Sequence, residues 1–365
     1  MGIAEKIGDI EHEMSRMQIN KATMHHYGLL KARLAKLRSE LLDASSKSSG
    51  GLRDGFDVKK SGDARVALVG FPSVGKSTLL NKLTDTESAT GAYEFTTLTS
   101  IVGVLKHNGT TIQVQDLPGI IEGAADGKGR GKQVIAAARN ADLILLMLDA
   151  ARGEAHKRLL EKELEAMGIR LNKRKPNVTI KVKAGGGLKF NATVPLTHIN
   201  ERLVHQILQI HKIFNVEVLV REDVTVDEFI DVLEGNRKYL PCLCVYNKID
   251  HLTVEEIDAI ARRPHSVVIS CEWDLNLDYL VEKMWEYLDI IRVYTKRRGS
   301  RPDFNEPLIM RRGASVEDIC RSIHREMVQS FKFALIWGTS AKHSPQRVGI
   351  QLVLEDEDVV QIHAG

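Results

Sequence analysis

One stretch decides the fold: Gly70-Phe71-Pro72-Ser73-Val74-Gly75-Lys76-Ser77. It follows the apolar run from Ala64 to Val69 and precedes Thr78-Leu79-Leu80, so a strand, a loop and a helix come in succession. The two glycines let the backbone curl and aim its N–H groups at phosphate oxygens. The helix dipole adds positive potential, Lys76 adds a charge for the β- and γ-phosphates, and the Ser77 hydroxyl can bind Mg²⁺. The pattern predicts a phosphate-binding loop rather than a glycine-rich turn that ends by chance in Lys-Ser.

A second segment predicts which base is bound. The apolar run from Tyr239 to Tyr246 predicts a buried strand that ends at Asn247-Lys248-Ile249-Asp250. The Asp250 carboxylate can accept hydrogen bonds from the N1–H and 2-amino group of guanine, whereas adenine would leave it desolvated and unpaired. Lys248 can lie over the base, and Asn247 can tie this segment to the phosphate loop. A strand over 266–269 leads to Ser270-Cys271-Glu272, which can bring backbone donors to the guanine carbonyl. We therefore expect GTP and GDP as ligands.

Residues for metal binding and hydrolysis stand between these two segments. A strand over 111–115 leads into Asp116-Leu117-Pro118-Gly119, where Asp116 can hold Mg²⁺ through water and the Gly119 amide can contact the γ-phosphate. The second Mg²⁺ oxygen is expected from Thr97, with Thr96 as the less favoured candidate. Ile120 stands where many GTPases place a glutamine that orients the attacking water, and an aliphatic side chain cannot do this. We therefore expect slow intrinsic hydrolysis and assign no catalytic residue.

Three motifs together resemble the Obg-related GTPases: the phosphate-binding loop, Phe95-Thr96-Thr97-Leu98, and the glycine-studded stretch from Asp116 to Gly131. Within that group the whole chain resembles the developmentally regulated GTP-binding proteins (DRG) of archaea and eukaryotes. The resemblance implies a translation-associated GTPase that uses Mg²⁺, associates with the ribosome and RNA, and works with a regulatory partner protein. Related potassium-activated GTPases carry asparagine at the position of Ser73, so stimulation by K⁺ stays a hypothesis.

Composition favours an intracellular protein of more than one domain. The chain has 365 residues, 43% of them hydrophobic, and its net charge of +3 is too small to argue for nucleic-acid binding. Its apolar runs are shorter than a membrane span, and residues 1–6 lack a secretory or myristoylation signal. The spacing of the cysteines, Cys242, Cys244, Cys271 and Cys320, does not suit zinc, and a disulfide framework is not expected. We expect a cytoplasmic protein with no membrane partner.

Hydrophobic periodicity predicts helices before the phosphate-binding loop. A first helix over 5–17 and leucines at three- and four-residue steps over 29–42 predict an antiparallel helix pair, followed by a Ser/Gly-rich linker over 45–51. This N-terminal helical pair and linker are expected to occupy residues 1–62. The basic face of the pair can bind RNA or a partner, or can simply be solvated.

The GTPase core is expected over residues 63–289, with an α+β insertion at about 172–224 that resembles the family's ribosomal-protein-like insert. The insertion is predicted because the base-reading strand begins only near residue 239. Residues 177–190, with glycines at 185–187, predict a hairpin, followed by a helix near 200–213 and a strand over 216–220. Basic residues at its edge are compatible with rRNA phosphates; they are Arg170, Lys173, Arg174, Lys175, Lys181 and Lys183.

Residues 290–365 predict a C-terminal ubiquitin-like β-grasp that resembles the TGS domain. Strands are expected over 290–295, 307–310, 333–338, 349–354 and 359–362. A helix is expected over 315–328, with Ser315 as its N-cap and Asp318 as the acidic partner, and 342–347 is a candidate RNA-contacting loop. The predicted fold is thus α/β: a P-loop GTPase core with an N-terminal helical pair, an α+β insertion and a β-grasp (TGS) domain.

Two functional classes fit these expectations. The first is a regulatory GTPase that acts in translation by docking on ribosomal RNA. The second is a scaffold or signalling GTPase that binds proteins and not RNA, with basic surfaces that only keep it soluble. A steep fall in RNA affinity with added salt would favour the first class, because phosphate contacts release counterions.

Overall fold

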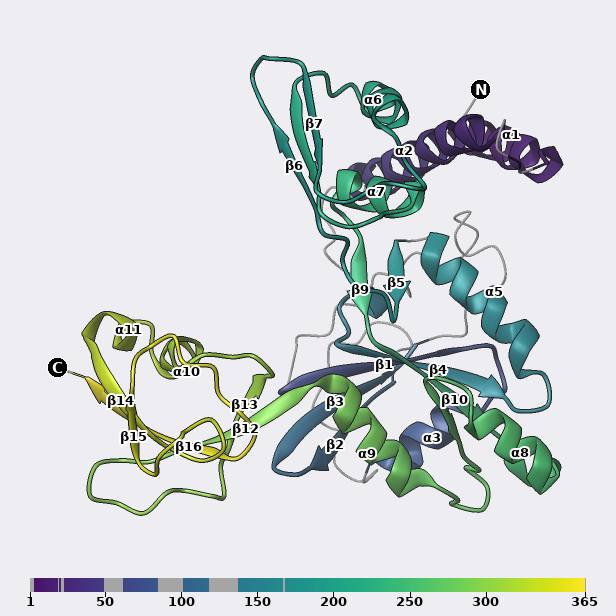
Figure 1. Ribbon diagram of the computed structural model, residues 1–365. Coiled ribbons are helices and arrows are strands. Elements are labelled where there is room, and N and C mark those ends of the chain that lie inside the picture. Colours follow the sequence, from purple (N-terminus) through teal and green to yellow (C-terminus); the bar gives the residue numbers. More distant parts are fainter. Residues whose placement is uncertain are drawn as a thin grey trace. The chain divides into compact units, whose positions relative to one another are not determined.

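The computed structural model describes residues 3–18, 20, 23–48, 62–84, 101–117, 137–166 and 168–364 (Figure 1). The chain divides into two compact units, each described by itself below. The first unit comprises residues 1–55, 122–132 and 161–240, and the second comprises residues 56–121, 133–160 and 241–365. Among the described residues, no helix is both long and apolar enough to span a bilayer. The predicted mixed α/β class is confirmed.

A six-stranded sheet of order β11-β10-β4-β1-β3-β2 forms the centre of the second unit. All neighbours pair in parallel except β2, which is antiparallel to β3. The central strands β1 and β4 are apolar almost throughout, as a parallel sheet that is covered on both faces requires. The strands are β1 (Ala64–Gly70), β2 (Ile101–His107), β3 (Thr110–Asp116), β4 (Leu143–Asp149), β10 (Cys242–Asn247) and β11 (Ser266–Val268).

Helices of the second unit pack on this sheet. Alternate strand residues such as Leu68 and Leu145 share one buried cluster with Leu79 of α3 and Leu280 of α9. Because β1, β3, β4 and β10 are parallel, the polar residues that follow them gather at one edge of the sheet. The helices are α3 (Lys76–Leu83), the first half of α5 (Gly153–Ala166), the short 3-10 helix η2 (Ile249–His251), α8 (Val254–Ala261) and α9 (Leu277–Leu288).

The strand predicted over 239–246 is broken into two. Pro241 lacks a backbone N–H and cannot continue the ladder, so β9 (Lys238–Leu240) ends before it and β10 starts after it. The two strands serve different sheets: β9 pairs with β5 (Ile169–Leu171) in the first unit, and β10 pairs with β4 in the second. The segment predicted to read the base thus begins where the chain leaves the first unit.

The first unit contains a three-stranded sheet of order β6-β8-β7, and the predicted hairpin is wrong. β6 (Val178–Val182) and β7 (Leu188–Ala192) flank β8 (Val216–Val220), which is antiparallel to β6 and parallel to β7. The physical reason is burial: Val216, Val218 and Val220 of β8 are at most 1% exposed, so the most apolar strand takes the centre. The two strands joined by the glycine turn are left at the edges.

The N-terminal helices belong to this same unit. α1 (Ile3–Arg16) packs on α2 (Met24–Ser48), as the predicted pair requires. The serines predicted to begin a linker remain helical as far as Ser48, because serine is only modestly unfavourable in a helix. Ala32 and Ala35 of α2 share a core with Phe229 of α7 (Val226–Glu234) and with α6 (Glu201–Ile210). The insertion expected at about 172–224 lies within this unit, whose compact part extends to Leu240.

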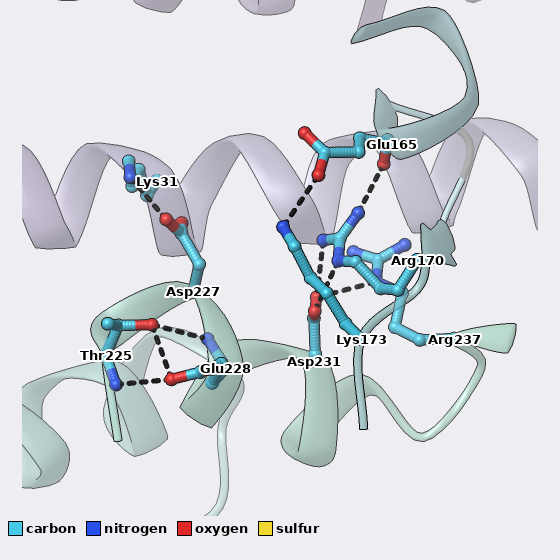
Figure 2. Close-up of polar contacts among 9 residues, drawn as sticks. All are labelled: Lys31, Glu165, Arg170, Lys173, Thr225, Asp227, Glu228, Asp231 and Arg237. Atoms are coloured by element: carbon cyan, nitrogen blue, oxygen red, sulfur yellow. Dashed lines mark hydrogen bonds and ion pairs between the residues drawn. The ribbon is translucent and has the colours of Figure 1, made fainter. Parts of the chain in front are cut away.

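A buried ion-pair network ties α7 to β5 in the first unit (Figure 2). Asp231 of α7 is 5% exposed and accepts two hydrogen bonds from Arg170, at 2.6 and 2.7 Å, and one from Arg237 at 3.1 Å. Arg170 also donates to the Glu165 carbonyl at the end of α5, whose carboxylate pairs with Lys173. These contacts neutralise two of the basic residues predicted to face RNA, and Glu217 pairs with a third, Lys183.

The C-terminal part of the second unit is a β-grasp, as predicted. Its five strands run in the order β13-β12-β16-β14-β15, with α10 packed on one face. Ser315 and Asp318 form the predicted capping box of α10. Among the described residues no strand forms over 349–354, and β15 instead overlaps the last two residues of the expected loop 342–347. The elements are β12 (Ile290–Thr295), β13 (Leu308–Arg311), α10 (Val316–Ile323), α11 (Met327–Ser330), β14 (Phe331–Trp337), β15 (Gln346–Val348) and β16 (Asp358–Ala364).

Candidate guanine nucleotide site

The loop between β1 and α3 is wound around the Lys76 ammonium. The Lys76 Nζ donates hydrogen bonds to the carbonyls of Gly70 at 3.2 Å and Phe71 at 3.1 Å. Gly75 has φ 98° and Ser73 has φ 63°, the left-handed conformations that curl the backbone here. A Cβ on Gly75 would collide with the Asn247 side chain, so glycine is required by both conformation and space. The result is a tight loop at the N-terminus of α3, suited to hold an anion.

Lys76 and Asp116 face each other in a poorly solvated place. Burial lowers the pKa of Lys76, and the nearby Asp116 carboxylate offsets part of that effect. Burial likewise raises the pKa of Asp116, although a hydrogen bond from Ser77 and the charge of Lys76 act against it. Burial thus disfavours the charged form of both side chains. A bound phosphate would stabilise the Lys76 ammonium, and a bound cation would stabilise the Asp116 carboxylate.

The oxygens near Asp116 fit a magnesium ion. The Ser77 hydroxyl donates to Asp116 Oδ2 at 2.5 Å, while Asp116 Oδ1 is buried without a partner among the described atoms. A serine hydroxyl and a carboxylate are the hard ligands that Mg²⁺ takes, together with waters and substrate phosphates. No cluster of three or more His, Cys, Asp or Glu that could hold a metal occurs in the described part of the chain. The predicted residues Thr97, Pro118, Gly119 and Ile120 lie outside the described residues.

Asn247 joins the base-reading segment to the phosphate loop, as expected. It closes β10, is 2% exposed, and its Nδ2 donates to the Val74 carbonyl at 2.9 Å. Its Oδ1 accepts from the Cys271 backbone N–H at 3.0 Å, so one donor expected to reach the guanine carbonyl is already engaged. Asn247 therefore fixes two loops with one side chain.

A hydrogen bond from Ser270 orients the Asp250 carboxylate. Its Oδ1 accepts from the Ser270 hydroxyl at 2.7 Å, and this bond chiefly lowers the pKa of Asp250 and keeps it ionised. An ionised carboxylate only accepts hydrogen bonds, which suits the two N–H donors of guanine. Lys248 adopts φ 68° and its Nζ pairs with Asp149 Oδ2 at 3.0 Å, at the end of the neighbouring strand β4.

These two segments enclose a pocket of about 510 Å³. That volume lies in the usual range for ligand sites, roughly 300–1,000 Å³. Sequence reasoning missed Lys82 and His251, although Lys82 stands one helical turn after Thr78 on the same face of α3 and His251 directly follows Asp250. Lys82 pairs with Asp274 at 2.5 Å. The lining residues are Ser73, Gly75, Thr78, Lys82, Asn247, Lys248, Asp250, His251, Cys271 and Glu272.

The other predicted residues lie around this pocket and not on its wall. Phe71 points its ring at His156 of α5, with ring centroids 4.6 Å apart. Leu117 is fully buried, and its N–H bonds to the Leu68 carbonyl. Residues that shape the loop or support its partners are Gly70, Pro72, Val74, Lys76, Ser77, Asp116 and Ser270.

Known proteins match the chain along its whole length. Residues 65–183 match the model of the 50S ribosome-binding GTPase, residues 185–290 the C-terminal region of that domain, and residues 291–364 the TGS domain. Human developmentally-regulated GTP-binding protein 2 is 62% identical over 362 residues, and its Dictyostelium discoideum homolog is 61% identical; both alignments cover 99% of each chain. A solved GTP binding protein from Pyrococcus horikoshii overlaps loosely, with TM-score 0.40 and 14% identity over 82% of this chain and 100% of that one. The similarity to these curated relatives over 99% of the chain, together with the matched family models, shows that the chain belongs to the developmentally regulated GTP-binding proteins, a family of P-loop GTPases that carry a TGS domain.

Proposed function

We propose that the chain binds GTP and GDP in the 510 Å³ pocket and hydrolyses GTP to GDP and phosphate. The observation that carries the proposal is Asn247, which links the phosphate loop to the segment that ends in Asp250. Lys76 would exchange its two carbonyl bonds for β- and γ-phosphate oxygens. Ser77 and Asp116 would hold Mg²⁺, which neutralises charge on the phosphates when bound. Asp250 would accept the two guanine donors, with Ser270 keeping it in place.

We further propose that intrinsic hydrolysis is slow. Ile120 cannot orient water, and water positioning contributes a large part of GTPase catalysis. The rate would then be set from outside, by the ribosome or by a regulatory partner protein of the kind the family uses. Stimulation by K⁺ is part of this proposal, although Ser73 stands where related potassium-activated GTPases carry the asparagine that helps hold the ion.

The proposed setting is translation in the cytoplasm, through association with the ribosome and RNA. The support is the description of the matched family and a set of exposed cations at the edge of the first unit. Arg174, Lys175 and Lys181 form no ion pair with a described carboxylate, so they are available to phosphates. The proposed organisation is residues 1–62, 63–289 and 290–365, with the insertion at about 172–224.

Phosphate release measured with and without purified ribosomes tests this proposal. We expect slow release alone, faster release with ribosomes, and a faster rate in potassium than in sodium buffer of equal ionic strength. Lys76→Ala should abolish ribosome-dependent release, because the γ-phosphate loses its cation. Full turnover by Lys76→Ala would refute the phosphate-binding role of this loop. Equal rates in the two salts would refute stimulation by K⁺.

One observation favours the scaffold or signalling alternative. Arg170, Lys173 and Lys183 are neutralised by carboxylates of their own unit, so the basic surface is smaller than the sequence predicts. RNA affinity separates the two functions: an affinity that falls steeply with salt supports the ribosomal role, and no measurable RNA affinity supports the scaffold.

A further inference from the structure

The loop that follows β11 is a closed turn at the wall of the candidate nucleotide pocket. Ser270 and Leu275 exchange two backbone hydrogen bonds, from Ser270 N to Leu275 O at 3.2 Å and from Leu275 N to Ser270 O at 3.0 Å. We call residues 270–275 the wall loop, because Cys271 and Glu272 within it line the pocket. Since its two ends are bonded to each other, we expect the wall loop to move as one piece.

The base-reading side of the pocket holds the wall loop at its first two residues. The Cys271 N–H donates to Asn247 Oδ1 at 3.0 Å, and the Ser270 hydroxyl donates to Asp250 Oδ1 at 2.7 Å. Both contacts reach the segment that ends in Asp250. A displacement of the wall loop would therefore disturb the carboxylate that is proposed to bind guanine.

The opposite side of the pocket holds the wall loop through an ion pair. Lys82 Nζ of α3 donates to Asp274 Oδ1 at 2.5 Å, and Lys82 itself lines the pocket. The Lys82 side chain is 30% exposed and the Asp274 side chain 64% exposed, so salt can reach the pair from solvent. Because α3 begins at Lys76, one short helix carries the phosphate-binding lysine at its first residue and holds the wall loop from its last turn.

We propose, on the basis of the guanine nucleotide binding put forward above, that Lys82 and Asp274 are positioning residues that keep the wall loop against α3 and slow nucleotide release. A bound nucleotide would contact α3 through its phosphates and the base-reading segment through guanine, and the ion pair joins the same two parts of the pocket. For the base to leave, the wall loop has to move away from α3, and the pair breaks as it does so. Because half-exposed ion pairs are weak, the pair is expected to slow release by no more than about fivefold.

Release of a fluorescent GDP analogue from the full chain, chased with excess unlabelled GDP, tests this role. Asp274→Asn removes one charge at a residue that does not line the pocket, Lys82→Gln removes the other, and the double variant removes both. Asp274→Glu keeps the charge. The matched control is Glu286→Gln on α9, which breaks a pair with Lys283 that has the same 2.5 Å length and exposures of 30% and 62%. Urea unfolding of each variant is measured in parallel.

Asp274→Asn and Lys82→Gln should each release the analogue about three- to fivefold faster, and the double variant no faster than the faster single, because both changes remove one interaction. Asp274→Glu and Glu286→Gln should release like the wild type, although Glu286→Gln should lose as much unfolding free energy as Asp274→Asn. In about 1 M salt, where the Debye length is about 3 Å, wild type and Asp274→Asn should release at nearly equal rates.

Equal release by wild type and Asp274→Asn at low salt, an equal acceleration in Glu286→Gln, or additive effects in the double variant would overturn the positioning role. In those three cases the wild type still binds GDP, so the proposed nucleotide site stands. A wild type that does not bind the analogue, or from which ADP displaces it as well as GDP does, refutes the guanine site and the positioning role together.

Discussion

Replacing Asn247 with alanine should separate the base-reading segment from the phosphate loop. The side chain is 2% exposed and satisfies two backbone groups, the Val74 carbonyl and the Cys271 N–H. Alanine leaves both of them buried and unpaired, at about 1–3 kcal/mol each. The expected loss of unfolding free energy is therefore roughly 2–6 kcal/mol, a large share of the ~5–15 kcal/mol that a folded domain has. Water that enters the gap can hydrogen-bond to these two backbone groups and reduce the loss of unfolding free energy, but it would move the two loops apart.

Nucleotide affinity should fall with stability, because both walls of the pocket depend on this side chain. GDP must then bring the two loops back together as it binds. If this reordering costs about 1.4 kcal/mol of the binding free energy, GDP binds about tenfold more weakly. The measurements are urea unfolding without nucleotide and titration with a fluorescent GDP analogue. Ser315→Ala is the control: it removes the N-cap of α10, costs about 1 kcal/mol, and touches no pocket residue. Asn247→Ala with unchanged GDP affinity and unchanged unfolding would refute the bridging role.

Four further changes have defined outcomes. Gly75→Ala forces a Cβ into Asn247 at φ 98° and should weaken GTP binding by more than about tenfold, as seen by titration. Asp250→Asn should weaken guanine nucleotides similarly, and an unchanged dissociation constant would refute guanine reading. Asp231→Ala should cost about 3–5 kcal/mol in urea unfolding, because it leaves two largely buried arginine side chains without their carboxylate. Asp227→Ala breaks only a half-exposed pair with Lys31 and should cost within about 1 kcal/mol (Figure 2). The raised pKa of Asp116 means that the folded state binds the proton more tightly, so its contribution to stability is lost as pH rises from the ordinary aspartate pKa of 3.8 through the raised value. The stability of the wild type relative to Asp116→Asn should therefore decline across that window in nucleotide-free unfolding, and a rise would contradict it.

The candidate nucleotide pocket was predictable because each motif that lines it is a short contiguous segment of the sequence. A glycine-bounded loop needs only its own strand and helix, and Asn247 and Asp250 follow an apolar strand whose end must lie at the same sheet edge. Lys82 and His251 were missed because charged residues on a helix face or in a turn are usually solvated. Only the folded pocket distinguishes them from other surface residues.

Features that depend on competition between distant segments were not predictable. The hairpin over 177–190 fails because β8, more than twenty residues later, is more apolar and takes the central position. Arg170 looked like an RNA-binding cation because its buried partner Asp231 lies on a helix 61 residues away. The contact of Phe333 with Arg347 and His363 on the β-grasp sheet was not predictable for the same reason, since these residues come together only through strand order.

Co-sedimentation with purified 80S ribosomes at near-physiological salt tests the central claim most directly. The chain is loaded either with a non-hydrolysable GTP analogue or with GDP, and Asn247→Ala is run beside the wild type. A nucleotide-gated ribosome factor should pellet more strongly with the analogue, and Asn247→Ala should lose the difference between the two nucleotides. Equal pelleting in both states, or none in either when the proposed regulatory partner protein is added, would contradict a ribosomal switch and favour the scaffold.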